Sequence, residues 1–175
     1  MEKLISYFLS TIYYTLFLFW LVLFHPIQWV CKNIFGYNAH RISVYVLNWF
    51  LVRNTHLLGT RYSFIGREKL PQNVPFIIVA NHQSLYDIPA IIWFMRDWHP
   101  KFISKKELGK GIPSVSYNLK HGGSALIDRK DPKQALSEIK KCGEFINKNN
   151  YSVTIFPEGT RSKTGIPKPF AVNGL

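Results

Sequence analysis

A histidine and an aspartate lie where a short apolar segment gives way to a helical pattern. Residues 76–80 are apolar and predict a buried strand, His82 follows this segment, and Asp87 comes five residues later. Residues 88–94 then have a helical pattern with Pro89 in the first turn, where a helix tolerates proline. A histidine whose second ring nitrogen is held by a carboxylate is a general base near neutral pH. The pair therefore predicts proton transfer at the end of a strand.

Two further predicted strands also end in polar residues. Residues 124–127 lead to Arg129, and residues 152–156 lead to a second polar group. That group consists of Glu158, Gly159, Thr160 and Arg161. Because the carboxyl ends of parallel strands share one edge of a sheet, we expect these residues to converge with His82 in one cleft. Arginine suits phosphate because its planar fork donates two parallel hydrogen bonds. A base beside a phosphate clamp predicts deprotonation of a hydroxyl on a phosphorylated substrate.

Each of these residues also has a structural explanation. His82 is a core histidine or a zinc ligand in the alternative interpretations, although no cysteine or second histidine has metal-site spacing from it. Asp87 suits the start of the following helix as a cap. In the same way, Arg129 and Asp131 could form a surface ion pair, and residues 157–160 could form an ordinary turn. The joint occurrence of these residues at successive strand ends favours the functional interpretation.

The predicted elements alternate between strand and helix. Strands are expected at residues 61–65, 76–80, 101–104, 124–127 and 152–156, helices at 88–94 and 131–148, and an irregular glycine-rich segment at 109–123. Asp131 suits an N-cap, with Pro132 at the first helical position. This order predicts an α/β fold: a mostly parallel sheet flanked by helices.

The first part of the chain predicts contact with a membrane. Residues 4–30 carry no formal charge, and these 27 residues are long enough to cross a bilayer core of about 30 Å. Aromatic residues are spread along this segment, so a helix lying in the headgroup region is an equal alternative to a span, and a buried helix of a soluble core is a third. Pro26 marks a kink or an end. Without a signal-peptide pattern, we expect the segment to be retained.

A second helix is expected over residues 42–58, with a stop at Gly59. Together the two helices suggest a membrane-docking pair, and the second also suits a cover for the sheet. We therefore expect membrane-associated helices in residues 1–58 and a catalytic domain in residues 59–175.

Charge and composition indicate the class of partner. The formal net charge is +12, all of it carried by residues 31–175, and 47% of residues are hydrophobic. A basic surface attracts polyanions, and since no nucleic-acid-binding motif accompanies it, we expect lipid phosphate rather than nucleic acid as partner. Cys31 and Cys142 have neither metal-site nor disulfide-framework spacing. The basic domain is expected on the cytoplasmic side of a membrane.

Three segments resemble the motif blocks of one enzyme family. Residues 81–87, NHQSLYD, resemble the NHx4D motif of glycerolipid acyltransferases. Residues 122–129, GGSALIDR, and residues 156–162, FPEGTRS, resemble the second and third blocks. Their order and spacing are similar to those of the 1-acyl-sn-glycerol-3-phosphate acyltransferase family, and the resemblance runs from residue 61 to the end of the chain.

The resemblance implies a role for each motif residue. His82 is then the general base, Asp87 orients it, and Arg129 contacts the substrate phosphate. Lys105 lies where many relatives have a lysine and is assigned to phosphate contact. The third block is assigned to binding the acyl acceptor through Glu158, Gly159, Thr160 and Arg161.

The implied reaction moves a fatty acyl group from acyl-CoA or acyl carrier protein to the 2-hydroxyl of lysophosphatidate. The product is phosphatidate, formed at the phospholipid bilayer, and neither a metal nor a redox cofactor is expected. Two alternatives remain: an acyltransferase acting on another lysophospholipid, and a non-catalytic membrane protein that binds anionic lipid through its basic surface.

The last residues depart from the family pattern. Residues 166–175 resemble the start of a fourth block, but Ala171 follows Phe170 where relatives usually have lysine. Relatives continue with further strands and helices, so we expect a catalytic domain that is incomplete at its C-terminal end.

Overall fold

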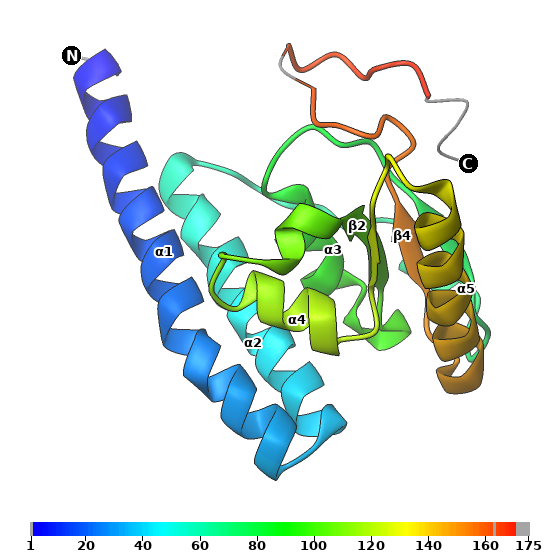
Figure 1. The fold of residues 1–175 in the computed structure, drawn as a ribbon. Helices are drawn as coiled ribbons and strands as arrows, with labels where there is room; N and C mark the ends of the chain where they lie inside the picture. Colours follow the sequence, from blue (N-terminus) through cyan, green and yellow to red (C-terminus); the bar gives the residue numbers. More distant parts are fainter. Residues whose placement is uncertain (1, 163, 171–175) are drawn as a thin grey trace.

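The computed structural model describes residues 2–162 and 164–170 and consists of a parallel sheet between helices (Figure 1). The strands are β1 (Ile77–Val79), β2 (Lys101–Lys105), β3 (Ala125–Ile127) and β4 (Val153–Ile155). The α-helices are α1 (Glu2–Ile34), α2 (Tyr37–Thr55), α3 (Asp87–Phe94), α4 (Val115–His121) and α5 (Pro132–Asn149). Short 3-10 helices are η1 (His56–Leu58), η2 (Arg67–Lys69), η3 (Arg96–Trp98) and η4 (Lys106–Gly109). The predicted fold class is confirmed.

The sheet has the strand order β1-β4-β2-β3, and all its pairs are parallel. One face is covered by α2 and α3, whose side chains meet β2 in a cluster that includes Val44 and Phe102. The other face is covered by α5, where Cys142 packs with Ala125 and Val153 (Figure 1). Because all four strands run the same way, their carboxyl ends form one edge of the sheet.

Strand β1 is less buried than its apolar sequence predicted. It pairs with β4 at the edge of the sheet, and Ile77 and Val79 are 62% and 57% exposed. In the parallel register Ile77 lies beside Val153, so both point to the α5 face. Helix α5 covers Val153 but does not extend over β1. The prediction of a buried strand is therefore wrong, because burial depends on which helices reach a strand.

The expected strand at residues 61–65 is absent, and this stretch has no regular secondary structure. The rings of Tyr62 and Phe64 lie 5.5 and 6.2 Å from the ring of Phe94 of α3. The Tyr62 hydroxyl lies 3.0 Å from that of Thr55. The alternating aromatic residues thus pack against helices instead of pairing with a strand.

The segment predicted to be irregular contains helix α4. Ser114, just before this helix, has a φ of 59°, and its hydroxyl donates to the Leu21 carbonyl at 2.6 Å. Its amide donates to His25 Nδ1 at 3.1 Å. A short helix fixed by such distant contacts leaves little periodic signal in the sequence.

Both N-terminal helices are longer than predicted: α1 ends later in the sequence, and α2 begins earlier. Helix α1 continues through Pro26 to Ile34, so this proline does not end the helix. Helix α2 begins at Tyr37 instead of residue 42 and is followed by η1, after which Gly59 adopts a left-handed φ of 76°. Leu21 and Phe24 of α1 pack against α2. The domain division at residue 58 stays a prediction.

Helix α1 is covered on one side only. Tyr13, Leu21, Phe24 and Gln28 are buried at helical spacing. The opposite side exposes apolar and aromatic side chains at Leu4, Ile5, Tyr7, Phe8, Tyr14, Leu18, Phe19, Val22, Leu23, Ile27, Trp29 and Ile34. By length and composition, this helix is able to cross a membrane. We call this exposed set the apolar face of α1.

Helix α5 begins and ends as predicted. The carboxylate of Asp131 accepts the amide of Gln134 at 3.0 Å, Pro132 is the first residue, and Asn150 closes the helix with a left-handed φ of 54°. The cap and the stop act over a few residues, which explains why local sequence was sufficient here.

Candidate active site

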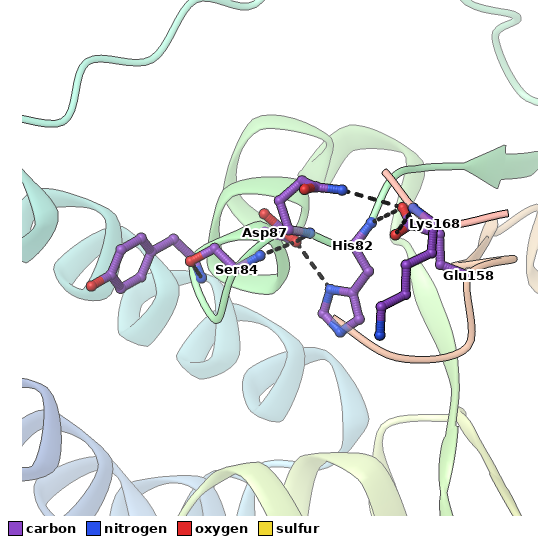
Figure 2. A network of polar contacts seen from close by, with 7 residues as sticks. His82, Ser84, Asp87, Glu158 and Lys168 are labelled. Atoms are coloured by element: carbon purple, nitrogen blue, oxygen red, sulfur yellow. Dashed lines mark hydrogen bonds and ion pairs between the residues drawn. The ribbon is translucent and has the colours of Figure 1, made fainter. Parts of the chain in front are cut away.

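The predicted pair is formed. His82 Nδ1 lies 3.0 Å from Asp87 Oδ2, and Figure 2 shows the two side chains facing each other. The same carboxylate oxygen accepts the amides of Gln83 at 2.8 Å and Ser84 at 2.9 Å. Asp87 is the first residue of α3, but its side chain points back into the loop and does not cap the helix. It therefore fixes both the imidazole and the loop that carries it.

The hydrogen bonds around Asp87 keep it ionised. Burial by itself raises the pKa of this carboxyl, but the hydrogen bond with His82 and the amides of Ser84 and Gln83 outweigh it, and the pKa lies below its usual value. A carboxylate on Nδ1 leaves Nε2, across the ring, as the nitrogen able to accept a proton. The geometry is that of an oriented general base.

An aromatic ring supports the imidazole from one side. The ring of Phe156, directly after β4, lies 4.2 Å from the ring of His82 with an interplanar angle of 22°. Phe156 in turn packs with Phe102 and the cluster beneath α3. The base is thus held between a carboxylate and the core, and sequence analysis did not assign Phe156 this supporting role.

Glu158 is turned toward the loop of the base. Its Oε1 accepts the His82 amide at 2.8 Å, and its Oε2 accepts the Lys168 amide at 3.0 Å (Figure 2). Gln83 Nε2 also lies 3.3 Å from Oε1. The residue is 6% exposed, and the amides of Lys168 and His82 hold its pKa below the usual value. These contacts indicate positioning, while the predicted contact with the acyl acceptor stays a prediction.

The loop after β4 joins the two sides of the site. The amide of Ser162 donates to the His82 carbonyl at 2.9 Å. On the other side, Arg129 Nη2 donates to the Gly159 carbonyl at 2.7 Å. This follows from the strand order, since β4 lies between β1 and the β2–β3 pair. The structure therefore brings His82, Glu158, Gly159 and Arg129 together, as the strand-end argument predicted.

The remaining predicted residues lie at the same edge of the sheet. Lys105 is the last residue of β2 and is exposed. Arg161 is exposed on the loop after β4, and Thr160 accepts a hydrogen bond from Lys168 Nζ at 3.0 Å. Their phosphate and acceptor contacts stay predictions.

Lys168 is a residue of this site that sequence analysis missed. Its backbone amide donates to Glu158 (Figure 2), and its ammonium donates to the Thr160 hydroxyl. The only sequence signal was its place in the segment that resembles the start of a fourth block. Ala171, where that block departs from the family pattern, lies outside the described residues. Lys168 therefore adds a positive charge next to Thr160, on the loop after β4.

In the described ranges, no three His, Cys, Asp or Glu side chains are grouped as a metal site.

The hydroxyl of Ser84, on the same loop as His82, accepts a hydrogen bond from the Tyr86 amide at 3.2 Å. The arrangement combines one oriented base with several cations. Such a site is suited to removing a proton from an alcohol whose substrate carries a phosphate.

Comparison with known proteins agrees with this geometry. The family model described as Acyltransferase matches residues 61–173, which is more than half of the chain. The chain belongs to the acyltransferase family. The match includes every predicted site residue, from the loop of His82 to Arg161.

Two relatives of this chain are both named 1-acyl-sn-glycerol-3-phosphate acyltransferase. The 1-acyl-sn-glycerol-3-phosphate acyltransferase of Helicobacter pylori is 45% identical over 92 residues, covering 51% of this chain and 36% of the relative. The enzyme of the same name from Cocos nucifera is 34% identical over 141 residues, covering 79% of this chain and 40% of the relative. The chain thus spans well under half the length of these relatives.

A solved acyltransferase has the same fold. The crystal structure of PlsC, the 1-acyl-sn-glycerophosphate (LPA) acyltransferase from Thermotoga maritima, matches with a TM-score of 0.75 and 25% identity. The match covers 100% of this chain and 69% of the PlsC chain. The N-terminal helices and the sheet are therefore both part of the shared structure.

Proposed function

We propose that this chain carries a membrane-associated O-acyltransferase that converts lysophosphatidate to phosphatidate. The acyl donor is acyl-CoA or acyl carrier protein, and the acceptor is the 2-hydroxyl of lysophosphatidate. The observation that carries this proposal is the His82–Asp87 pair, 3.0 Å apart, on a loop that Glu158 ties to the arginine side of the site. The names of the relatives support the choice of substrate.

His82 acts on the acceptor hydroxyl. Nε2 takes its proton as the oxygen attacks the thioester carbonyl, the carbon–sulfur bond breaks, and the proton passes to the thiolate that leaves. Asp87 holds the tautomer that exposes Nε2 and stabilises the imidazolium. General-base catalysis of this kind contributes about 10²–10⁴ in rate. The transfer neither gains nor loses electrons, so it requires no redox cofactor.

The cations of the site position the acceptor. Arg129, Arg161, Lys105 and Lys168 lie at the carboxyl edge of the sheet or on the loops that follow it. Binding the phosphate there fixes the hydroxyl relative to His82, and such positioning lowers the barrier further. Monoacylglycerol, which lacks the phosphate, should therefore be a poor acceptor.

The apolar face of α1 supports attachment to a membrane. The opposite side of α1 is buried against α2, and α2 in turn covers the sheet. Lipid can therefore contact α1 only through the apolar face. This one-sided exposure favours a helix embedded in the surface of the bilayer over one surrounded by lipid. The basic domain then faces anionic headgroups on the cytoplasmic side.

The test is acyl transfer to lysophosphatidate in detergent or vesicles. Wild type should produce phosphatidate, while His82→Ala should lose about 10²–10⁴ in kcat with an unchanged circular dichroism spectrum. His56→Ala is the matched control, since His56 is exposed on η1 and should leave turnover unchanged. Turnover retained in His82→Ala would overturn the assignment of the base. Transfer to another lysophospholipid in preference to lysophosphatidate would replace the acceptor but keep the base.

A further inference from the structure

A second cluster of ionisable side chains lies at the opposite end of the sheet from His82. Lys101 is the first residue of β2, His99 comes just before it, and Tyr151 comes just before β4. Arg41 reaches this cluster from α2. Because the strands are parallel, their amino ends form the edge away from the loops of the candidate active site. The proposed acyl transfer makes no use of this cluster.

Among the described residues, the side chains that contact the two cations of the cluster are neutral. Arg41 Nη1 donates to the Tyr151 hydroxyl at 3.0 Å and lies 3.2 Å from His99 Nε2. Lys101 Nζ lies 5.0 Å from the ring centroid of Tyr151 and 5.6 Å from that of Tyr37. Aromatic rings attract an ammonium group but do not neutralise it. The cluster therefore concentrates positive charge.

No carboxylate compensates this charge within the part of the chain that the structure describes. Lys101 is 7% exposed, and none of the described ion pairs includes Lys101 or Arg41. Arg41 Nε is buried and makes no hydrogen bond with a described residue. Burying charges without a counter-charge is costly, so a pair of cations in this environment favours an anion. Burial, with the nearby charge of Arg41, lowers the pKa of Lys101 to about 7, and a bound anion would raise this pKa again and favour the charged ammonium.

A small cavity is lined by both Lys101 and Arg41. Its volume is about 20 Å³, and its polar lining consists of Tyr37, His40, Arg41, Tyr45, Lys101, Asn118 and Ser124. This volume is enough for one water molecule or one monatomic ion. We call it the basic cavity.

We propose that the basic cavity binds a single halide ion, chloride under physiological conditions, between the Lys101 ammonium and the Arg41 guanidinium. The ion links β2 with α2, and since α1 packs on α2, it helps to fix the helical pair to the sheet. This site is independent of acyl transfer, and its role is to stabilise the folded chain.

The test in solution is thermal unfolding in detergent with sodium bromide replacing sodium gluconate at constant ionic strength. Raising bromide a hundredfold across its binding range should raise the Tm of wild type by about 2–5 °C. Lys101→Met should lose this response, and Lys110→Met, which removes an exposed lysine, should keep it. A bromide response in Lys101→Met equal to that of wild type would overturn the site.

A direct measurement uses wild type alone and so does not depend on the folding of a variant. Crystals grown with sodium bromide should show an anomalous peak within hydrogen-bond distance of Lys101 Nζ. A cavity that holds only water in these crystals, or a wild-type Tm that does not respond to bromide, would refute the proposal.

Discussion

The carboxylate of Glu158 accepts the backbone amide of His82 at 2.8 Å, so a residue from the loop after β4 holds the loop after β1 (Figure 2). The second oxygen of Glu158 holds the amide of Lys168 in the same way. The motif glutamate is therefore placed to position the base, and both of its oxygens are occupied by the chain itself.

Replacing Glu158 should affect turnover more than substrate binding. Glu158→Ala frees the amides of His82 and Lys168, so the imidazole loses its fixed position, and we expect kcat to fall about 10–100-fold with a smaller change in the KM for lysophosphatidate. Glu158→Gln keeps one acceptor oxygen and should recover part of the loss. Glu107→Gln, on the exposed part of η4, is the control. A raised KM with unchanged kcat would instead support direct contact with the acceptor.

The hydrogen bonds of Asp87 predict a defined dependence of stability on pH. Its pKa falls on folding, so it stabilises the folded chain above its unfolded pKa of about 3.9 and loses this contribution as the pH falls through the folded value. Asp87→Asn should therefore lower the free energy of unfolding by about 1–2 kcal/mol at pH 6. The difference from wild type should shrink below pH of about 4.

Denaturant unfolding of both proteins between pH 3 and pH 7 measures this difference. If the difference is the same at every pH, the contribution of Asp87 does not come from its charge.

The bond between Arg129 and the Gly159 carbonyl predicts a role in phosphate binding. Arg129 is exposed, and its hydrogen bond to Gly159 directs the guanidinium to the loop after β4. Arg129→Ala should raise the KM for lysophosphatidate about tenfold or more, with little change in the KM for the acyl donor. Lys130→Ala removes a neighbouring exposed cation and should change neither value. Equal effects of the two substitutions would indicate general attraction by the basic surface.

Two glycines near or in α5 should respond to alanine in opposite directions. Gly123 has a φ of +90°, and a Cβ there would lie 2.3 Å from Phe145 Cε1, so Gly123→Ala should cost about 2–4 kcal/mol of stability. Gly143 lies within α5 with no contact for an added Cβ, so Gly143→Ala should stabilise by up to about 1 kcal/mol. Thermal unfolding of both variants measures the contrast. A Gly123→Ala variant as stable as wild type would contradict the packing of Phe145 against Gly123.

Local sequence was sufficient where the physical cause is local. Asp131 caps α5 through the amide three residues later, and the five-residue spacing of His82 and Asp87 lets one loop bring both side chains together. The polar residues after the apolar segments marked the strand ends, and parallel pairing then placed them at one edge. The grouping of the candidate site residues at one edge and the α/β class were therefore predictable from the sequence.

Tertiary structure decided what depends on contacts between distant segments. The insertion of β4 between β1 and β2 lets Glu158 reach His82 while Gly159 reaches Arg129. The exposure of Ile77 reflects the reach of α5, which no pattern within β1 encodes. Sequence periodicity records which side of an element is apolar, but only the packing of the whole chain determines what covers that side and which polar groups meet.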